Sequence, residues 1–317
     1  MTDASKECNV WQISAGPSSR SYAKQFLDYG VALIGPGDGG PWRRESCDNK
    51  FLSRFASEVQ KGDVFLLRAG ASEIQAVGIV ASGYKYLSQF DDVNGWDLQH
   101  GRRVRWCKFP DTQVFDELIF GANPPRLSRV HSEDLIDYAN RFVQSPPTDW
   151  QICTLPCLPV GEPALETPPR ELRGLIAQIN DLISVYGDID SFGELPSESE
   201  MVAHYIVPFL RALGWPVERI AVEWHNVDVC VFTKLPRIPQ FCHYLIEAKR
   251  VGAGVEGALE QAVRYAQTLN SHCNVIVSDG IRYRMYEASK DYAPVAYANL
   301  GRLKESSVEL FKLMKKP

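Results

Sequence analysis

The sequence predicts a two-domain protein with a β-rich N-terminal domain and an α/β C-terminal domain. A length of 317 residues fits about two domains. The stretch at residues 146–169 is rich in proline, has no clear periodicity and is typical of a linker. Short apolar runs broken by glycine precede it, and helix and strand patterns follow it. We therefore expect one domain at residues 1–145 and another at residues 170–317.

The N-terminal domain contains several short runs with the composition of β-strands. They are VWQISAG, GVALIG, DVFLLRAG, AVGIVASGYKY and RRVRWCKF. Two helices fit between them, at about Ser19–Tyr29 and Lys50–Lys61. Short strands separated by glycine turns favour a compact, mostly antiparallel sheet or β-barrel with a few helices.

The C-terminal domain begins with helical periodicity over about Arg170–Tyr186. A second helix starts at Pro196 and Ser197 and ends at Gly214. Three strands, a helix, two strands and a terminal helix follow. Their sequences are ERIAVEWH, VDVCVFTKL, FCHYLIEAKR, GALEQAVRYAQTLN, NVIVSDG, IRYRMYEA and LKESSVELFKLMKK. This order predicts a mixed α/β sandwich with a mostly hairpin-linked sheet.

Composition excludes several classes of protein. The net charge of −5 argues against a protein that coats nucleic acid without regard to sequence, although a local basic groove remains compatible with it. The N-terminus lacks the features of a secretory signal, and no run approaches the roughly 18 apolar residues of a membrane helix. The cysteines form no C-x-x-C pair, so reduced thiols are expected, with zinc at Cys153 and Cys157 as the alternative. We expect a cytoplasmic protein that does not bind membranes.

Three charged residues are predicted to meet at one end of the C-terminal sheet. The strands VDVCVFTKL and FCHYLIEAKR flank the turn PRIPQ. In a hairpin, facing residues have numbers with a constant sum, and pairing Asp228 with Glu247 centres the turn between Arg237 and Ile238. Glu247 and Lys249 share a face because side chains alternate along a strand. Asp228, Glu247 and Lys249 should therefore converge.

This triplet has the composition of a metal-dependent hydrolytic site. Two adjacent carboxylates repel each other, and a hard divalent cation such as Mg²⁺ or Mn²⁺ relieves that repulsion. A cation held in this way activates water and stabilises charge on a phosphate, while Lys249 would orient the attacking water. The alternative is a salt bridge between Glu247 and Lys249 beside an unrelated Asp228.

The residues around the triplet resemble the PD-(D/E)XK nucleases, with Asp228 as the motif aspartate and Glu247-Ala248-Lys249 as E-x-K. The segments ESEMVAHYIVPFLRALGW, VEWHNVDVCVF, YLIEAKR, GALEQAVRYA and NVIVSDGIRYRMYE are similar to the nuclease domain at the start of type I restriction motor subunits. The resemblance implies that Asp228, Glu247 and the backbone carbonyl of Ala248 hold the metal.

The same resemblance implies further site residues. Glu200 on the preceding helix would approach the metal, with Glu198 as the alternative. Gln261 would take part in catalysis, and it shares a helical face with Tyr265, four residues later. Asn226 and Val227 precede the aspartate, where the family's name suggests a proline that is not required. The chain has no G-x-x-x-x-G-K-[ST] sequence, so nucleotide hydrolysis is not expected.

Aromatic and basic residues in the N-terminal domain suggest nucleic-acid binding. Trp42 follows the loop GPGDGGP, and Trp96 lies in DDVNGWDLQH, where an aromatic ring can stack on a base. Packing in the core is the alternative for both. The basic residues of HGRRVRWCK are expected to contact the DNA backbone, although side chains that alternate along a strand cannot all reach it. A solvated edge strand is the alternative. Arg102, Arg103 and Arg105 are the residues expected to make these contacts, and Lys108 lies close to them in the sequence.

The spacing of VWQISAG, VALIG, GDVFLL, AVGIVASGYKY and VRW resembles the EVE branch of the PUA-like superfamily over about residues 9–110. The resemblance implies a reader that flips a modified base into an aromatic pocket. By position, the pocket residues would be Ser14, Asp38, Trp42 and Tyr84, and Trp96 is a further candidate.

A modified-base reader joined to a nuclease suggests a modification-dependent restriction endonuclease. Its substrate would be double-stranded DNA that carries a modified base, with modified cytosine as the expected one. One active site cuts one strand, so a homodimer is expected. Two alternatives are a nuclease for RNA or unmodified DNA, and a binding protein whose nuclease fold has lost its activity.

Overall fold

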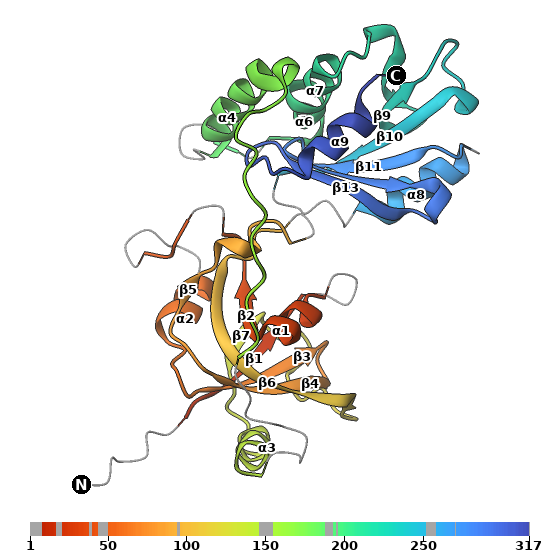
Figure 1. The fold of residues 1–317 in the computed structure, drawn as a ribbon. Helices are drawn as coiled ribbons and strands as arrows, with labels where there is room; N and C mark the ends of the chain where they lie inside the picture. Colours follow the sequence, from red (N-terminus) through yellow and green to blue (C-terminus); the bar gives the residue numbers. More distant parts are fainter. Residues whose placement is uncertain are drawn as a thin grey trace. The chain divides into compact units, whose positions relative to one another are not determined.

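The chain divides into two compact units, Met1–Gly161 and Glu162–Pro317, each with its own β-sheet (Figure 1). The computed structural model describes residues 8–16, 21–37, 40–43, 50–93, 96–145, 155–187, 193–194, 196–251, 258–269 and 271–316. The expected two-domain α/β architecture is confirmed at this level. None of the helices in these ranges combines the length and apolar character needed to cross a bilayer.

The first unit is built on a seven-stranded sheet, counted over its described residues. Its strands are β1 (Val10–Ser14), β2 (Val31–Ile34), β3 (Val64–Ala69), β4 (Glu73–Val80), β5 (Lys85–Tyr86), β6 (His100–Val114) and β7 (Leu127–Arg129). The main path runs β2-β6-β4-β3-β1-β7, and β5 pairs with β6. All these pairs are antiparallel except β1 with β3. No ladder among the described residues joins β2 to β7, so the pairing is that of an open sheet.

Three helices, counted over the described residues, cover this sheet. They are α1 (Ala23–Tyr29), α2 (Lys50–Ser57) and α3 (Glu133–Gln144). Phe26 of α1 and Phe55 of α2 belong to one buried apolar cluster, whereas Leu135 and Ala139 of α3 belong to another that contains alternate residues of β3. Gly30 ends α1 with a positive φ of 57°, a conformation that glycine adopts without strain. The sequence interpretation assigned no structure to β7 and α3.

The second unit is built on a six-stranded sheet within its described residues, in the order β13-β12-β11-β10-β9-β8. The strands are β8 (Ile220–Trp224), β9 (Val227–Phe232), β10 (Cys242–Ala248), β11 (Asn274–Ser278), β12 (Arg282–Glu287) and β13 (Ala293–Asn299). Only β10 and β11 pair in parallel; the other pairs in these ranges are antiparallel. The sequence interpretation expected two strands after the helix GALEQAVRYAQTLN and missed β13.

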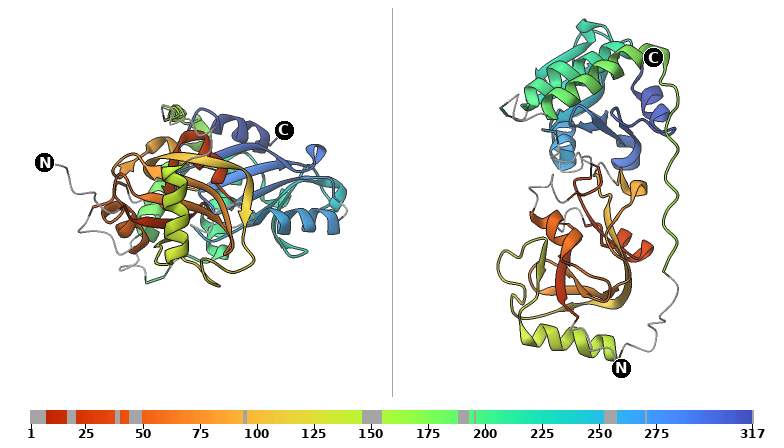
Figure 2. Two further views of the ribbon diagram at one scale, coloured as in Figure 1. Left: turned by 90° about the horizontal axis from the view of Figure 1, so that it is seen from below. Right: turned by 90° about the vertical axis from the view of Figure 1, so that its left-hand side faces the viewer.

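Helices cover both faces of this second sheet (Figure 2). They are α4 (Arg173–Gly187), α6 (Glu198–Met201), α7 (Val207–Ala212), α8 (Leu259–Thr268) and α9 (Ser307–Met314). The first three and α9 pack with Tyr244, Ile246 and Ala248 in one cluster. Helix α8 packs with Cys230 and Leu245 in another. Alternate residues of β10 therefore face different helix layers, as expected for a sandwich.

A π-helical segment, Val202–Ile206, interrupts the helix that the sequence predicts from Ser197 to Gly214. Pro208 follows this segment closely. Proline lacks a backbone N–H and clashes with the carbonyl four residues earlier, so a local widening of the helix accommodates it. The capping box of Ser197 and Glu200 begins the helix, with each side chain bonded to the other residue's backbone amide.

Candidate functional site

The predicted register between β9 and β10 is confirmed. Val231 pairs with Tyr244, Cys230 with Leu245 and Val229 with Ile246. One further step in this register brings Asp228 opposite Glu247. Both residues alternate onto the face that α8 covers, because their strand neighbours two positions away, Cys230 and Leu245, belong to the cluster on that face.

Glu247 is the most deeply buried carboxylate of this group. Its side chain is 2% exposed, its Oε1 accepts a hydrogen bond of 2.8 Å from Lys249 Nζ, and its Oε2 is buried without a partner among the described residues. Burial raises the pKa of Glu247 to about 7; the hydrogen bond from Lys249 opposes this rise, and the charge of Asp228 adds to it. A buried carboxylate oxygen without a hydrogen-bond donor costs free energy unless a ligand binds to it.

Lys249 is held beside this carboxylate. Its side chain is 21% exposed, and its backbone amide donates to the carbonyl of Ser278 at 2.8 Å. Burial lowers the pKa of Lys249, but the hydrogen bond and charge of Glu247 raise it by more. The amine therefore stays protonated at neutral pH, at the open end of a largely buried ion pair.

Asp228 binds the backbone of the neighbouring strand. Its Oδ2 accepts a hydrogen bond of 2.7 Å from the amide of Ala248, the residue between Glu247 and Lys249. Burial raises the pKa of Asp228, whereas this hydrogen bond and the charge of Lys249 lower it. The bond fixes the aspartate carboxylate against the E-x-K segment. The backbone carbonyl of Ala248 remains a predicted ligand.

Helix α6 carries two acidic residues, Glu198 and Glu200, and they differ in their relation to this cluster. Burial is the largest influence on the pKa values of the cluster: it raises those of Asp228 and Glu247 and lowers that of Lys249. The charge of Glu198 raises all three. Glu200, which the resemblance favoured, is held differently: its Oε2 accepts from the amide and hydroxyl of Ser197 at 2.8 and 2.9 Å. The capping box therefore accounts for the position of Glu200, and Glu198 is the acidic residue of α6 whose charge acts on the cluster.

Gln261 and Tyr265 lie on one face of α8, as their spacing predicts, and Gln261 Nε2 donates to Tyr265 Oη at 3.2 Å. Within the described ranges, no three His, Cys, Asp or Glu side chains are grouped closely enough to hold a metal ion. The predicted ligand set has two carboxylates and one backbone carbonyl. The buried and unpartnered Oε2 of Glu247 fits a divalent cation, since hard cations take oxygen ligands.

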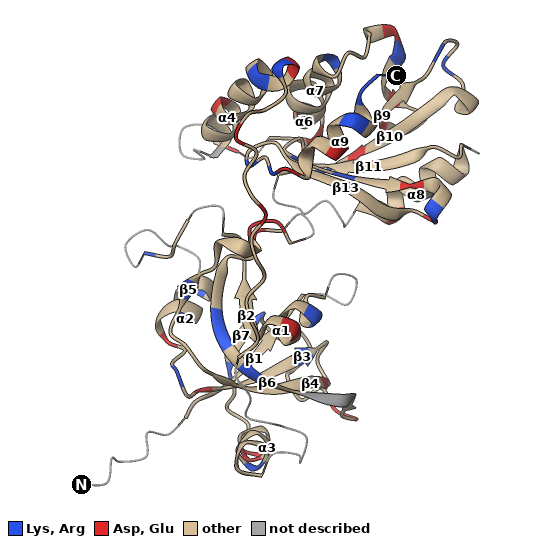
Figure 3. Ribbon diagram, in the orientation of Figure 1, with Lys and Arg blue, Asp and Glu red and all other residues tan. Residues whose placement is uncertain are grey.

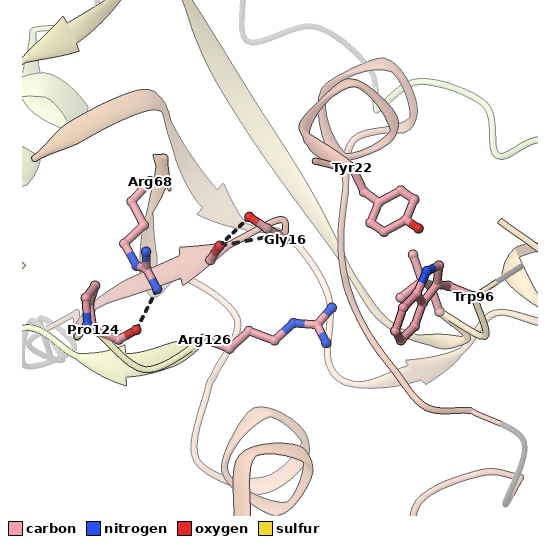
Figure 4. A pocket seen from close by; sticks show the side chains of 8 residues that line it. Gly16, Tyr22, Arg68, Trp96, Pro124 and Arg126 are labelled. Atoms are coloured by element: carbon pink, nitrogen blue, oxygen red, sulfur yellow. Dashed lines mark hydrogen bonds between the residues drawn. The ribbon is translucent and has the colours of Figure 1, made fainter. Parts of the chain in front are cut away.

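A cavity of about 350 Å³ lies in the first unit (Figure 4). Two residues of the predicted base pocket, Ser14 and Trp96, line it together with Tyr22, Arg68, Leu98 and Arg126. Ser14 and Arg68 are register partners at the ends of the parallel strands β1 and β3. The hydroxyl of Ser14 donates to the carbonyl of Gly16 at 3.1 Å and thereby stabilises the turn after β1.

Trp42 and Tyr84, predicted for the same pocket, do not line this cavity. They contact each other edge to face, and the amide of Trp42 donates to Tyr84 Oη at 2.8 Å. Tyr84 Oη also lies 2.8 Å from His100 Nδ1. Asp38 lies outside the described residues. Local sequence reasoning missed Tyr22, Arg68 and Arg126, which stand singly and form no motif.

The three predicted DNA-backbone arginines lie in β6, part of which is coloured blue for Lys and Arg in Figure 3, and they differ in burial. Arg102 is 2% exposed and donates to the carbonyls of Phe55, Ala56 and Ser82 at 2.8, 2.9 and 3.2 Å. Burial lowers its pKa to about 10. The prediction that Arg102 contacts DNA is therefore corrected: Arg102 ties α2 to the sheet.

The two other arginines are more accessible. Arg103 is partly buried and donates to the carbonyls of Gly30 at 3.2 Å and Tyr29 at 3.4 Å, and also to that of Pro156. Arg105 is exposed. Alternation along β6 explains why Arg102 and Arg105 lie in opposite environments, since they are an odd number of residues apart. Arg105 remains the best candidate for a phosphate contact.

Arg102→Ala is expected to lower the free energy of unfolding of the first unit by about 3 kcal/mol, because three buried carbonyls lose their donor. Arg105→Ala should leave stability within about 0.5 kcal/mol and weaken binding to all DNA sequences alike. Urea unfolding and salt-dependent DNA binding measure the two effects. Equal stability of the two variants would contradict the structural role of Arg102.

A family described as a domain of unknown function, DUF8426, matches residues 11–123. Among solved structures, one described as a fragment of an HsdR subunit of a type I restriction enzyme from Vibrio vulnificus YJ016 is 18% identical, with a TM-score of 0.26. That match covers 38% of this chain and 25% of that structure. No curated protein matches the sequence.

Proposed function

We propose that this protein is an endonuclease that depends on Mg²⁺ or Mn²⁺ and cuts double-stranded DNA carrying a modified base. The second unit hydrolyses the phosphodiester, and the first unit binds the base. The observation that carries the nuclease proposal is the cluster of Asp228, Glu247 and Lys249, in which the buried Oε2 of Glu247 has no partner among the described residues.

Each residue has a role that follows from its environment. Asp228 and Glu247, with the carbonyl of Ala248, would hold the cation, and Glu198 would act from α6. When bound, the cation would lower the pKa of a water molecule and stabilise negative charge on the phosphate. Lys249 holds its proton, orients the attacking water and neutralises the negative charge that develops on the phosphate oxygens. Gln261 and Tyr265 would position the phosphate from α8.

The reader proposal is supported by the cavity of the first unit. It is lined by the rings of Tyr22 and Trp96, on which a flipped base can stack, and it lies at the lower end of the size range of ligand pockets. Modified cytosine is the proposed base. We further propose a cytoplasmic homodimer, since two active sites are needed to cut both strands.

The test is cleavage of matched DNAs that contain plain, methylated, hydroxymethylated, glucosylated or carboxylated cytosine, with Mg²⁺ and with EDTA. Cleavage of one modified DNA, only with Mg²⁺, is the expected result. Cleavage of every DNA would support the nuclease proposal and contradict the proposal that the first unit recognises a modified base. Cleavage of RNA alone would favour the RNA alternative. Absence of cleavage from all substrates would favour a binding protein with an inactive nuclease fold.

A further inference from the structure

The cavity of the first unit is lined by positive charge. Arg68 and Arg126 contribute to its wall, and no Asp or Glu is found among the described residues that line it. The rest of the lining is mostly small, aromatic or aliphatic. A partly enclosed space of this kind favours an anion, because cations in a low-dielectric setting attract opposite charge more strongly than in water.

Arg68 organises one wall rather than reading the ligand. It is 7% exposed, and its guanidinium donates to the carbonyls of Gly70 at 2.5 Å, Pro124 at 2.9 Å and Pro125 at 3.0 Å, and to the side chain of Gln12. Gln12 in turn donates to the carbonyl of Pro125 at 2.6 Å. These bonds fix the segment that immediately precedes Arg126.

Arg126 extends from this fixed segment into the cavity (Figure 4). Its side chain reaches into the space between the turn at Gly16 and the ring of Trp96, and Tyr22 lies beside that ring. Its neighbour Leu127 begins β7 and is fully buried. The guanidinium is therefore presented on a rigid base, next to aromatic surfaces suited to a planar ring.

We propose that this cavity selects a cytosine whose C5 substituent is a carboxylate, and that Arg126 is the residue that reads it. The inference rests on the proposed function of the first unit as a modified-base reader. Arginine binds carboxylates through two parallel hydrogen bonds, which gives both strength and direction. A methyl group would instead remove water from the guanidinium without replacing its hydrogen bonds, which is unfavourable.

The test measures binding of the full chain in EDTA, so that cleavage does not interfere. The probes are short duplexes with one central cytosine that is plain, methylated, hydroxymethylated, glucosylated or carboxylated at C5. The carboxylated duplex is expected to bind at least about tenfold more tightly than the others. Arg126→Gln should reduce this preference to less than about threefold.

Two further variants separate recognition of the C5 substituent from the effect of losing a positive charge. Arg129→Gln removes a positive charge at an exposed position of β7, three residues after Arg126 and outside the cavity, and should keep the preference. Arg126→Lys keeps the charge but loses the planar fork, and should show an intermediate preference. Unfolding midpoints establish that each variant is folded.

The outcomes of this experiment are distinct. A preference for carboxylated DNA that disappears in Arg126→Gln supports the inference. Tightest binding to methylated, hydroxymethylated or glucosylated DNA, or a carboxylate preference that survives Arg126→Gln, overturns the inference and leaves the reader proposal intact. Equal binding to all five duplexes overturns both the inference and the reader proposal, and the nuclease proposal is then judged by cleavage alone.

Discussion

Asp228→Asn and Lys249→Gln are each expected to lower the rate of DNA cleavage by at least about 10³-fold, which corresponds to about 4 kcal/mol of lost transition-state stabilisation. Asp228→Asn removes one of two proposed anionic ligands while keeping an oxygen that accepts from the amide of Ala248. Lys249→Gln removes the protonated amine that contacts Glu247. Single-turnover cleavage at saturating enzyme measures the chemical step in both variants.

The controls separate chemistry from folding and from DNA binding. Asp291→Asn is the matched change at an exposed position of the same unit, where φ is 53°, a conformation that asparagine tolerates. It should cleave at the original rate. Both active-site variants should bind modified DNA as the original protein does. Full cleavage by either one would move the active site away from this cluster.

Glu247→Gln is expected to abolish cleavage and, at the same time, to stabilise the metal-free protein above pH 7. The folded-state pKa of about 7 exceeds the ordinary value of 4.5. Between these values the folded protein holds a proton that the unfolded chain has released, so stability falls as pH rises through this window. The loss reaches at most about 3 kcal/mol. Glutamine carries no charge to bury and still accepts from Lys249.

Urea unfolding in EDTA at pH 5 and pH 8 measures this effect. The original protein should lose stability between the two values, and Glu247→Gln should lose much less. Glu218→Gln, an exposed change in the same unit, should behave as the original. Saturating Mg²⁺ should restore the stability of the original protein at pH 8 and leave Glu247→Gln unchanged. A Mg²⁺ effect of equal size on both would place the cation elsewhere.

The nuclease cluster was predictable because its geometry is local. A short hairpin fixes the register of β9 and β10, and alternation fixes which side chains share a face. The same reasoning could not separate Glu198 from Glu200, because the choice depends on which carboxylate closes the capping box with Ser197. Strand β13 was missed because Pro294 and a register shift opposite Tyr286 interrupt its pattern.

The wall of the cavity was less predictable because it depends on contacts between distant parts of the chain. Arg68 and Arg126 stand alone in the sequence, and only the pairing of β1 with both β3 and β7 brings them together. The burial of Arg102 likewise depends on α2, whose carbonyls it binds. Alternation along a strand shows that two faces differ but cannot say which one a helix will cover.

The pairing of β1 with β7 also has a consequence for the synthesis of the protein. Gln12 pairs with Ser128, more than a hundred residues later, and Arg126 lies just before that strand. The cavity therefore cannot be completed until the ribosome has released the chain beyond β7. A shortened chain that ends near residue 110, where the resemblance to the reader family ends, would expose the free edge of β1 and lack Arg126. Such a fragment should aggregate, and a version of the first unit that folds alone has to extend through α3.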